Sequence, residues 1–159
     1  GGQVANVEPT PGESLIFAYS RGPASVLFVY DPTQDTALYS DTLIPGGGLV
    51  KLTPDGEYAF YNSPGTMIPP TADFRLKILD VHSLQVVSEL VTSTTFNDTL
   101  PEYYIPTERM EITPDGRWLV LLDAQQRWQM LVFNIETMKF TDYVQFDSPV
   151  GSVTVMIRP

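Results

Sequence analysis

Short apolar runs separated by turn residues recur along the whole chain. In three places a run rich in strand-forming residues follows a turn built from proline and glycine, at residues 9–17, 53–61 and 113–121. Proline presets φ, and glycine accepts the positive φ that a tight reversal needs. The second and third copies share the letters Thr-Pro-Asp-Gly, and the first copy is looser. Each copy therefore predicts a turn followed by a strand.

A second pattern follows each of these turns. An apolar strand ends in Asp31, Asp80 or Asn134, and Asp and Asn side chains initiate turns by bonding the backbone ahead of them. The strands are expected at 26–31, 76–80 and 131–134, with polar turns at 32–35, 81–84 and 135–138. Further strands are expected after those turns (36–43, 85–92, 139–146) and before the next proline turn (48–53, 108–113, 151–158).

The pattern repeats with a period typical of propeller blades. The turn glycines Gly12, Gly56 and Gly116 lie 44 and 60 residues apart, and each repeat holds four short antiparallel strands. We therefore predict an all-β fold, a partial β-propeller of three four-stranded antiparallel blades plus one extra strand. As one array over 1–159, the blades are expected at about 3–43, 48–92 and 108–146, with the strand 152–157 belonging to a further blade.

The Thr-Pro-Asp-Gly turn, the apolar strand after it and the later strand ending in Asp or Asn resemble one known family. They are similar to the β-propeller repeats of the YVTN/lactonase-like and amine-dehydrogenase-heavy-chain type. The resemblance covers nearly the whole chain as three repeats. It implies the fold, but these motifs are turn chemistry and carry no active-site residue over to this chain.

Three blades form an open wedge with two exposed faces, because a closed propeller usually has four to eight blades. Exposed apolar faces of this size usually either bind a partner or cause aggregation. The wedge can close as a homodimer of half-propellers or against other subunits or polypeptide, and the lone strand 152–157 favours the second route. The remaining alternative is that three blades pack alone, with their own loops covering the edges.

Two long segments, 64–72 and 93–107, are expected on the same rim between the second and third blades. Proline-stiffened apolar loops with tyrosines often recognise protein partners. The candidate partner-binding residues on them are Met67, Ile68, Phe96, Tyr103 and Tyr104. The alternative is that these loops cover the central channel or a neighbouring blade.

Composition narrows the choice of partners. Nine basic residues against nineteen acidic ones give a net charge of −10, which disfavours nucleic acid and anionic membrane surfaces. No apolar run reaches the roughly 20 residues that span a bilayer, so no direct membrane insertion is expected. Zero cysteine leaves the compartment open, and Asn97-Asp98-Thr99 matches the glycosylation acceptor pattern. We expect an extracytoplasmic location, periplasmic or secreted.

Residues for catalysis or metal binding are sparse. His82 is the only histidine and has no partner for nucleophilic catalysis evident from spacing. Asp31 and Asp35 flank a turn and could ligate calcium, although turn initiation explains them better. Gly46-Gly47-Gly48 precedes no helix, which excludes a phosphate-binding loop. We expect no catalytic residue, no metal site and no cofactor.

The sequence therefore favours a non-catalytic interaction module or a subunit of a larger assembly. It would bind protein through open blade faces and a loop-rich rim. One alternative is a fragment of a lactonase- or dehydrogenase-like propeller enzyme whose active site other polypeptide completes. Another is a small-ligand or calcium-binding module.

Overall fold

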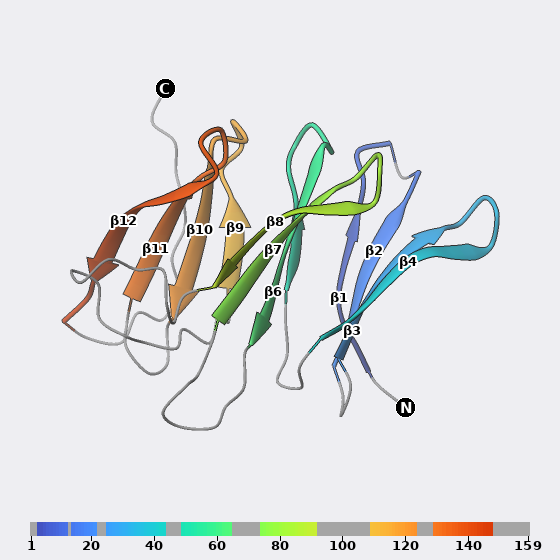
Figure 1. Cartoon of the computed structure of the whole chain (residues 1–159), viewed down its shortest axis with the longest axis horizontal. Helices are drawn as coiled ribbons and strands as arrows, with labels where there is room; N and C mark the ends of the chain where they lie inside the picture. Colours follow the sequence, from blue (N-terminus) through green and yellow to red (C-terminus); the bar gives the residue numbers. More distant parts are fainter. Residues whose placement is uncertain are drawn as a thin grey trace. The chain divides into compact units, whose positions relative to one another are not determined.

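The computed structural model describes residues 3–12, 14–21, 25–43, 49–64, 74–91, 109–123 and 129–147. Within these residues every regular element is a β-strand, and the strands form three four-stranded antiparallel sheets (Figure 1). The predicted all-β class is therefore confirmed. The described part of the chain contains no helix with the length and hydropathy needed to cross a membrane. The predicted strand 152–157 lies outside the described residues.

Each sheet follows the chain in simple up-and-down order, so sequence neighbours are also neighbours in the sheet. The first sheet contains β1 (Gln3–Pro9), β2 (Ile16–Arg21), β3 (Ser25–Asp31) and β4 (Thr36–Leu43). The second contains β5 (Val50–Leu52), β6 (Tyr58–Pro64), β7 (Phe74–Asp80) and β8 (Gln85–Val91). The third contains β9 (Arg109–Ile112), β10 (Trp118–Asp123), β11 (Gln129–Asn134) and β12 (Lys139–Gln145).

The chain divides into two units, Gly1–Tyr104 and Ile105–Pro159. The first two sheets belong to the first unit, and the third sheet belongs to the second. The prediction that residues 1–159 form one continuous array of blades remains untested.

The Thr-Pro-Asp-Gly turns are closed by a buried threonine. The Thr53 amide donates to the carbonyl of Tyr58 at 2.9 Å, and the Thr53 hydroxyl accepts from the Tyr58 amide at 3.0 Å. Gly56 donates to the Thr53 carbonyl at 2.8 Å and has φ 75°, where glycine avoids the steric cost of a Cβ. The third sheet repeats these bonds around Thr113.

The first repeat closes the same reversal with a different turn. Thr10 bonds the residue five positions on, as Thr53 does, so Gly12 occupies the place of Asp55 and not that of Gly56. Gly12, with φ 85°, therefore occupies the third position of the turn. Type II turns require positive φ at this position, and glycine is the residue usually found there. The expected equivalence of the three turn glycines is wrong for Gly12, because proline at the second position suits both turn types.

The turns after β3, β7 and β11 begin as expected from their Asp or Asn residue. Oδ1 of Asp80 accepts from the amide and hydroxyl of Ser83 at 2.7 and 2.9 Å. Asn134 bonds the amide and hydroxyl of Thr137 in the same way, at 2.8 and 3.0 Å. Each turn then ends on a residue with positive φ, namely Asp35, Leu84 and Met138. The predicted role of Asp80 and Asn134 in initiating these turns is therefore confirmed.

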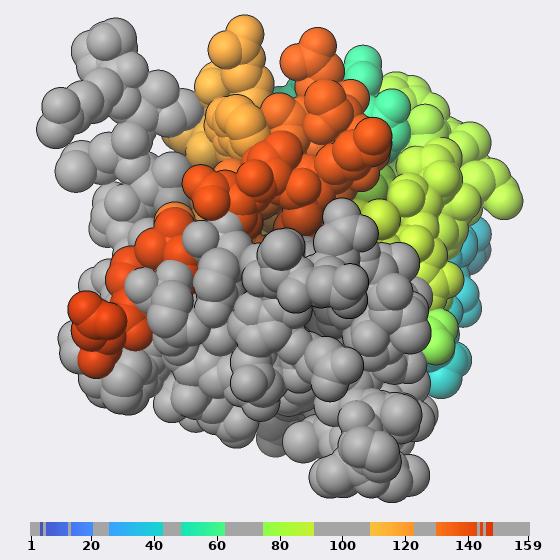
Figure 2. Space-filling view, turned by 60° about the vertical axis from the view of Figure 1, so that its left-hand side comes forward, coloured from blue at the N-terminus to red at the C-terminus, as the bar shows by residue number. Residues whose placement is uncertain are grey.

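A β-bulge recurs at one place in all three sheets. The pairing of the third strand with the fourth shifts after Val29, Ile78 and Val132. The shift leaves one extra residue on the fourth strand, which is Leu38, Val87 or Thr141. The fourth strands are also largely exposed, as Figure 2 shows for β8 (light green).

The core of the first unit lies between its two sheets. Buried side chains of β2 and β3 pack against buried side chains of the second sheet; the members are Phe17, Tyr19, Leu27, Val29, Val50, Ala59, Tyr61, Leu79 and Val81. In the second unit, Phe133 is fully buried and meets Phe140 edge-on, with ring centroids 5.2 Å apart. Alternation along each strand sends these residues to one face and their neighbours to the other.

Candidate functional site

The five predicted partner-binding residues, Met67, Ile68, Phe96, Tyr103 and Tyr104, all lie outside the described residues. Their role therefore stays a prediction. The described residues offer two features that bear on function. One is an exposed apolar face of the first sheet, and the other is a polar cluster between the first two sheets.

The exposed face of the first sheet is formed by alternate residues of β1, β2 and β3. Val7 pairs with Ala18, and Ala18 pairs with Phe28, so the three form one row across the sheet. Val4 lies on the same side, because it pairs with Ser20. Val4, Val7 and Phe28 are 65%, 52% and 39% exposed. We call this surface, defined by Val4, Val7, Ala18 and Phe28, the open face.

The second sheet contains the corresponding row, and there it is buried. Val50 pairs with Tyr61, and Tyr61 pairs with Lys77, in the same register as Val7, Ala18 and Phe28. Val50 and Tyr61 are fully buried, since they face the first sheet in the shared core. One and the same side of the repeat is therefore covered by a sheet in one copy and exposed in the other.

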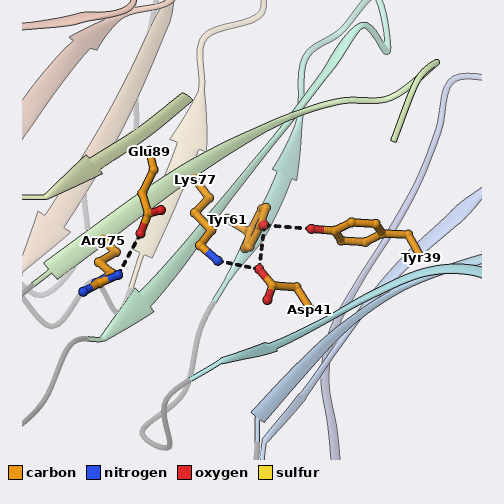
Figure 3. Close-up of polar contacts among 6 residues, drawn as sticks. All are labelled: Tyr39, Asp41, Tyr61, Arg75, Lys77 and Glu89. Atoms are coloured by element: carbon orange, nitrogen blue, oxygen red, sulfur yellow. Dashed lines mark hydrogen bonds and ion pairs between the residues drawn. The ribbon is translucent and has the colours of Figure 1, made fainter. Parts of the chain in front are cut away.

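A polar cluster lies at the edge of the contact between the first two sheets. Lys77 on β7 donates to Oδ2 of Asp41 on β4 at 2.6 Å, and the Tyr61 hydroxyl donates to the same oxygen at 2.9 Å (Figure 3). Because the Tyr61 proton points at Asp41, the Tyr39 hydroxyl donates to the Tyr61 oxygen at 3.3 Å. We call Tyr39, Asp41, Tyr61 and Lys77 the Asp41 cluster.

Electrostatics keep the Tyr61 phenol of the Asp41 cluster protonated. Burial of Tyr61 and its hydrogen bonds to Tyr39 and Asp41 raise the pKa of Tyr61 far above its ordinary value, so the phenol stays a donor. The Lys77 ammonium also lies 5.9 Å from the centre of the Tyr61 ring, within reach of a cation–π contact. The arrangement is suited to fastening the first sheet to the second.

Two further polar contacts join the same sheets along β1 and β5. Oδ1 of Asn6 accepts from the Val50 amide at 2.9 Å, and Lys51 pairs with Glu8 at 2.8 Å. At the turns, a Cβ added to Gly56 would lie 2.9 Å from Cδ of Pro11. The first two sheets therefore pack closely at their turns, and polar side chains join them along β1 and β5.

The residues considered for chemistry occupy turns. His82 is exposed and its amide donates to Asp80 at 3.1 Å, which is a turn bond. Asp31 accepts from Thr33 and Gln34 and so initiates its turn, while Asp35 accepts from the Tyr30 hydroxyl. In the described ranges, no group of three or more His, Asp or Glu side chains is placed to hold a metal ion.

Reasoning from sequence did not find the Asp41 cluster. One signal was present: Lys77 interrupts the apolar run 76–79, where the third sheet has Leu131 and the first has Phe28. A cation in a buried strand row needs a partner. Its partner could not be named, because Asp41 is 36 residues away and on another sheet.

Comparison with solved structures places this arrangement among known folds. Hydrazine synthase of Kuenenia stuttgartiensis matches with a TM-score of 0.66 and 17% identity over 91% of this chain and 37% of that one. The β-propeller domain of Myceliophteria thermophila Cps50 (Swd1) matches with a TM-score of 0.63 and 12% identity over 92% and 44%. The fold is that of a β-propeller.

The three sheets are accordingly propeller blades. A third similar structure, the RRP9 WD40 repeats, matches with a TM-score of 0.61 and 14% identity, covering 94% of this chain. The chain spans 37% to 44% of the length of these chains. No family model and no curated protein matches the sequence.

Proposed function

We propose that this chain is a non-catalytic β-propeller interaction module, or a subunit of a larger assembly, that binds protein through its open face. The observation that carries the proposal is the contrast between two equivalent valines. Val7 is 52% exposed on the first blade, whereas Val50 is fully buried on the second. A face that is buried in one repeat and bare in the next is suited to receive further polypeptide.

The occupant is either a second copy, which completes a ring of half-propellers, or polypeptide of another subunit. Both routes cover apolar surface that otherwise remains in water, which is the main source of free energy in association. The proposal takes residues 1–159 as one array of blades with a further strand at 152–157. We further propose that this chain is a β-propeller of the YVTN/lactonase-like type. The Thr-Pro-Asp-Gly turns support this assignment.

The rim contributes the second part of the proposed surface. Met67, Ile68, Phe96, Tyr103 and Tyr104 belong to the long segments between described strands, and loops on a rigid scaffold commonly carry binding residues. Their apolar and aromatic chemistry is that of interface anchors. The enzymatic alternative has no observation in its favour among the described residues.

The mass of the particle in solution tests the open face. We expect wild-type chain to be found in an assembly, measured by light scattering, and Val7→Lys to shift it toward the monomer by placing an ammonium on the open face. Val87→Lys is the matched control, because Val87 is 53% exposed on the bulge of β8 and outside the open face. It should leave the mass unchanged.

Two results would contradict the proposal. One is a wild-type monomer that unfolds cooperatively and forms no complex. The other is an assembly that Val7→Lys and Val87→Lys weaken equally.

A further inference from the structure

The three blades differ at the positions that face Asp41. In the second blade these positions are Tyr61 and Lys77, which pair with one another across β6 and β7. In the first blade the same row of the sheet has Ala18 and Phe28, and in the third blade it has Leu121 and Leu131. At these two described positions, only the second blade therefore offers an O–H and an N–H donor to a carboxylate.

Asp41 is itself an exception among the fourth strands. It pairs with Leu27 on β3, and the residue in the same register is Leu90 on β8 and Val144 on β12. The first blade thus presents one carboxylate where the other two blades present an aliphatic side chain. Both members of the ion pair depart from the repeat pattern, and they meet each other at 2.6 Å.

We propose that Asp41 determines which blade docks on the first blade: its carboxylate accepts the Tyr61 and Lys77 donors of the second blade and rejects equivalent faces whose side chains at these two positions carry only carbon. This inference concerns the contact between the first two blades and the contacts with other copies that it disfavours, and it stands independently of the proposed function.

The selectivity follows from desolvation. The side chains of Lys77 and Asp41 are only 18% and 20% exposed, so a face packed on Asp41 removes most of its water. Against Ala18 and Phe28 of another copy, the carboxylate would lose that water and gain no donor. An ionised group buried without a partner is strongly unfavourable. The pair therefore works against head-to-tail packing of first blades from two copies.

Substitutions borrowed from the other repeats separate selectivity from stability. Asp41→Leu copies Leu90, and Lys77→Leu copies Leu131. Each single change leaves one buried charge unpaired and should lower the ratio of folded to unfolded protein by about 10- to 100-fold, measured by urea unfolding. The double variant D41L/K77L removes both charges and should recover to within about threefold of wild type, since apolar replacement of a buried pair is often neutral.

The decisive measurement is the mass distribution after refolding from denaturant. D41L/K77L should give species larger than those of wild type at equal concentration, because its first blade now accepts apolar faces of other copies. The control is R75L/E89L, which removes the Arg75–Glu89 pair at 3.0 Å that joins β7 to β8 within one blade. That variant should refold to the mass of wild type.

Charge reversal covers the case in which the leucine variants fail to fold. D41K and K77D alone should each be destabilised, and D41K/K77D should recover at least tenfold of the lost folded-to-unfolded ratio and refold to the wild-type mass. The proposal is overturned if D41L/K77L, or failing that either single reversal, refolds to the mass distribution of wild type. It is also overturned if D41K/K77D shows no recovery over the single changes.

Discussion

At the scale of single residues, the fold depends on a few side chains that close turns. Asp31, Asp80 and Asn134 accept bonds from the backbone just ahead, and Gly56 and Gly116 supply positive φ after an aspartate. These are interactions between residues at most five apart. They explain why the turns could be predicted from sequence.

Gly56 is expected to tolerate substitution less than Gly12. Both have positive φ, so alanine at either position is disfavoured by about 1–2 kcal/mol. At Gly56 the new Cβ would also lie 2.9 Å from Pro11, whereas at Gly12 it would meet nothing within 4 Å. Urea unfolding should therefore show a larger loss for Gly56→Ala than for Gly12→Ala. Equal losses would mean that the contact with Pro11 relaxes freely.

Acid should destabilise the turns that aspartate initiates. Bonds from Thr33 lower the pKa of Asp31, and bonds from Ser83 lower the pKa of Asp80. A carboxyl whose pKa is lower in the folded than in the unfolded chain stabilises the fold fully above the unfolded pKa of about 3.9. That contribution is lost as the pH falls through the folded pKa.

The midpoint of urea unfolding should therefore move to lower urea concentration as the pH is lowered below about 4. Asp80→Asn should make this dependence shallower while the protein remains folded at neutral pH, because Asn134 already performs the same role in the third sheet. An unchanged pH profile in Asp80→Asn would exclude this carboxyl as a source of acid sensitivity.

At the scale of elements, each sheet is a meander whose described connections are of two kinds of turn, and its fourth strand carries a bulge. The strand expected at 36–43 coincides with β4, and those expected at 85–92 and 139–146 end one residue later than β8 and β12. The strand at 48–53 is shorter in the structure, Val50–Leu52. Strand positions were predictable because apolar runs and turn residues mark both ends of each strand.

The threonine that closes each proline turn should be important for the hairpin it joins. Thr53 is buried, and its hydroxyl accepts from the Tyr58 amide at 3.0 Å. Thr53→Val leaves that amide without its acceptor and should lower the free energy of unfolding by about 1–2 kcal/mol, measured by urea denaturation. Thr53→Ser keeps the hydroxyl and should lose clearly less. Equal losses would assign the effect to the shape of the side chain.

At the scale of the whole molecule, equivalent faces of the first two blades differ in burial. The row containing Val50 is buried between two blades, while the row containing Val7 is exposed. The repeat sequence predicts that every blade has two faces to cover. It does not say which faces the chain covers itself, because that depends on contacts between blades.

The rim residues allow a separate test at this scale. Replacing Met67, Tyr103 and Tyr104 together by Ser should reduce the assembled fraction in light scattering and leave the melting temperature nearly unchanged, since interface anchors contribute to binding more than to folding. A large fall in melting temperature would instead support the alternative in which these segments cover the propeller itself.

The sequence by itself determined the strands, their turns and the propeller fold, because each of these depends on residues close together in the chain. Only the tertiary structure brought Asp41 to Tyr61 and Lys77, which lie 20 and 36 residues further on. It also left Val7 and Phe28 exposed. Packing of one sheet on another decides such features, and a local pattern cannot encode which distant face will supply the missing donor or the covering surface.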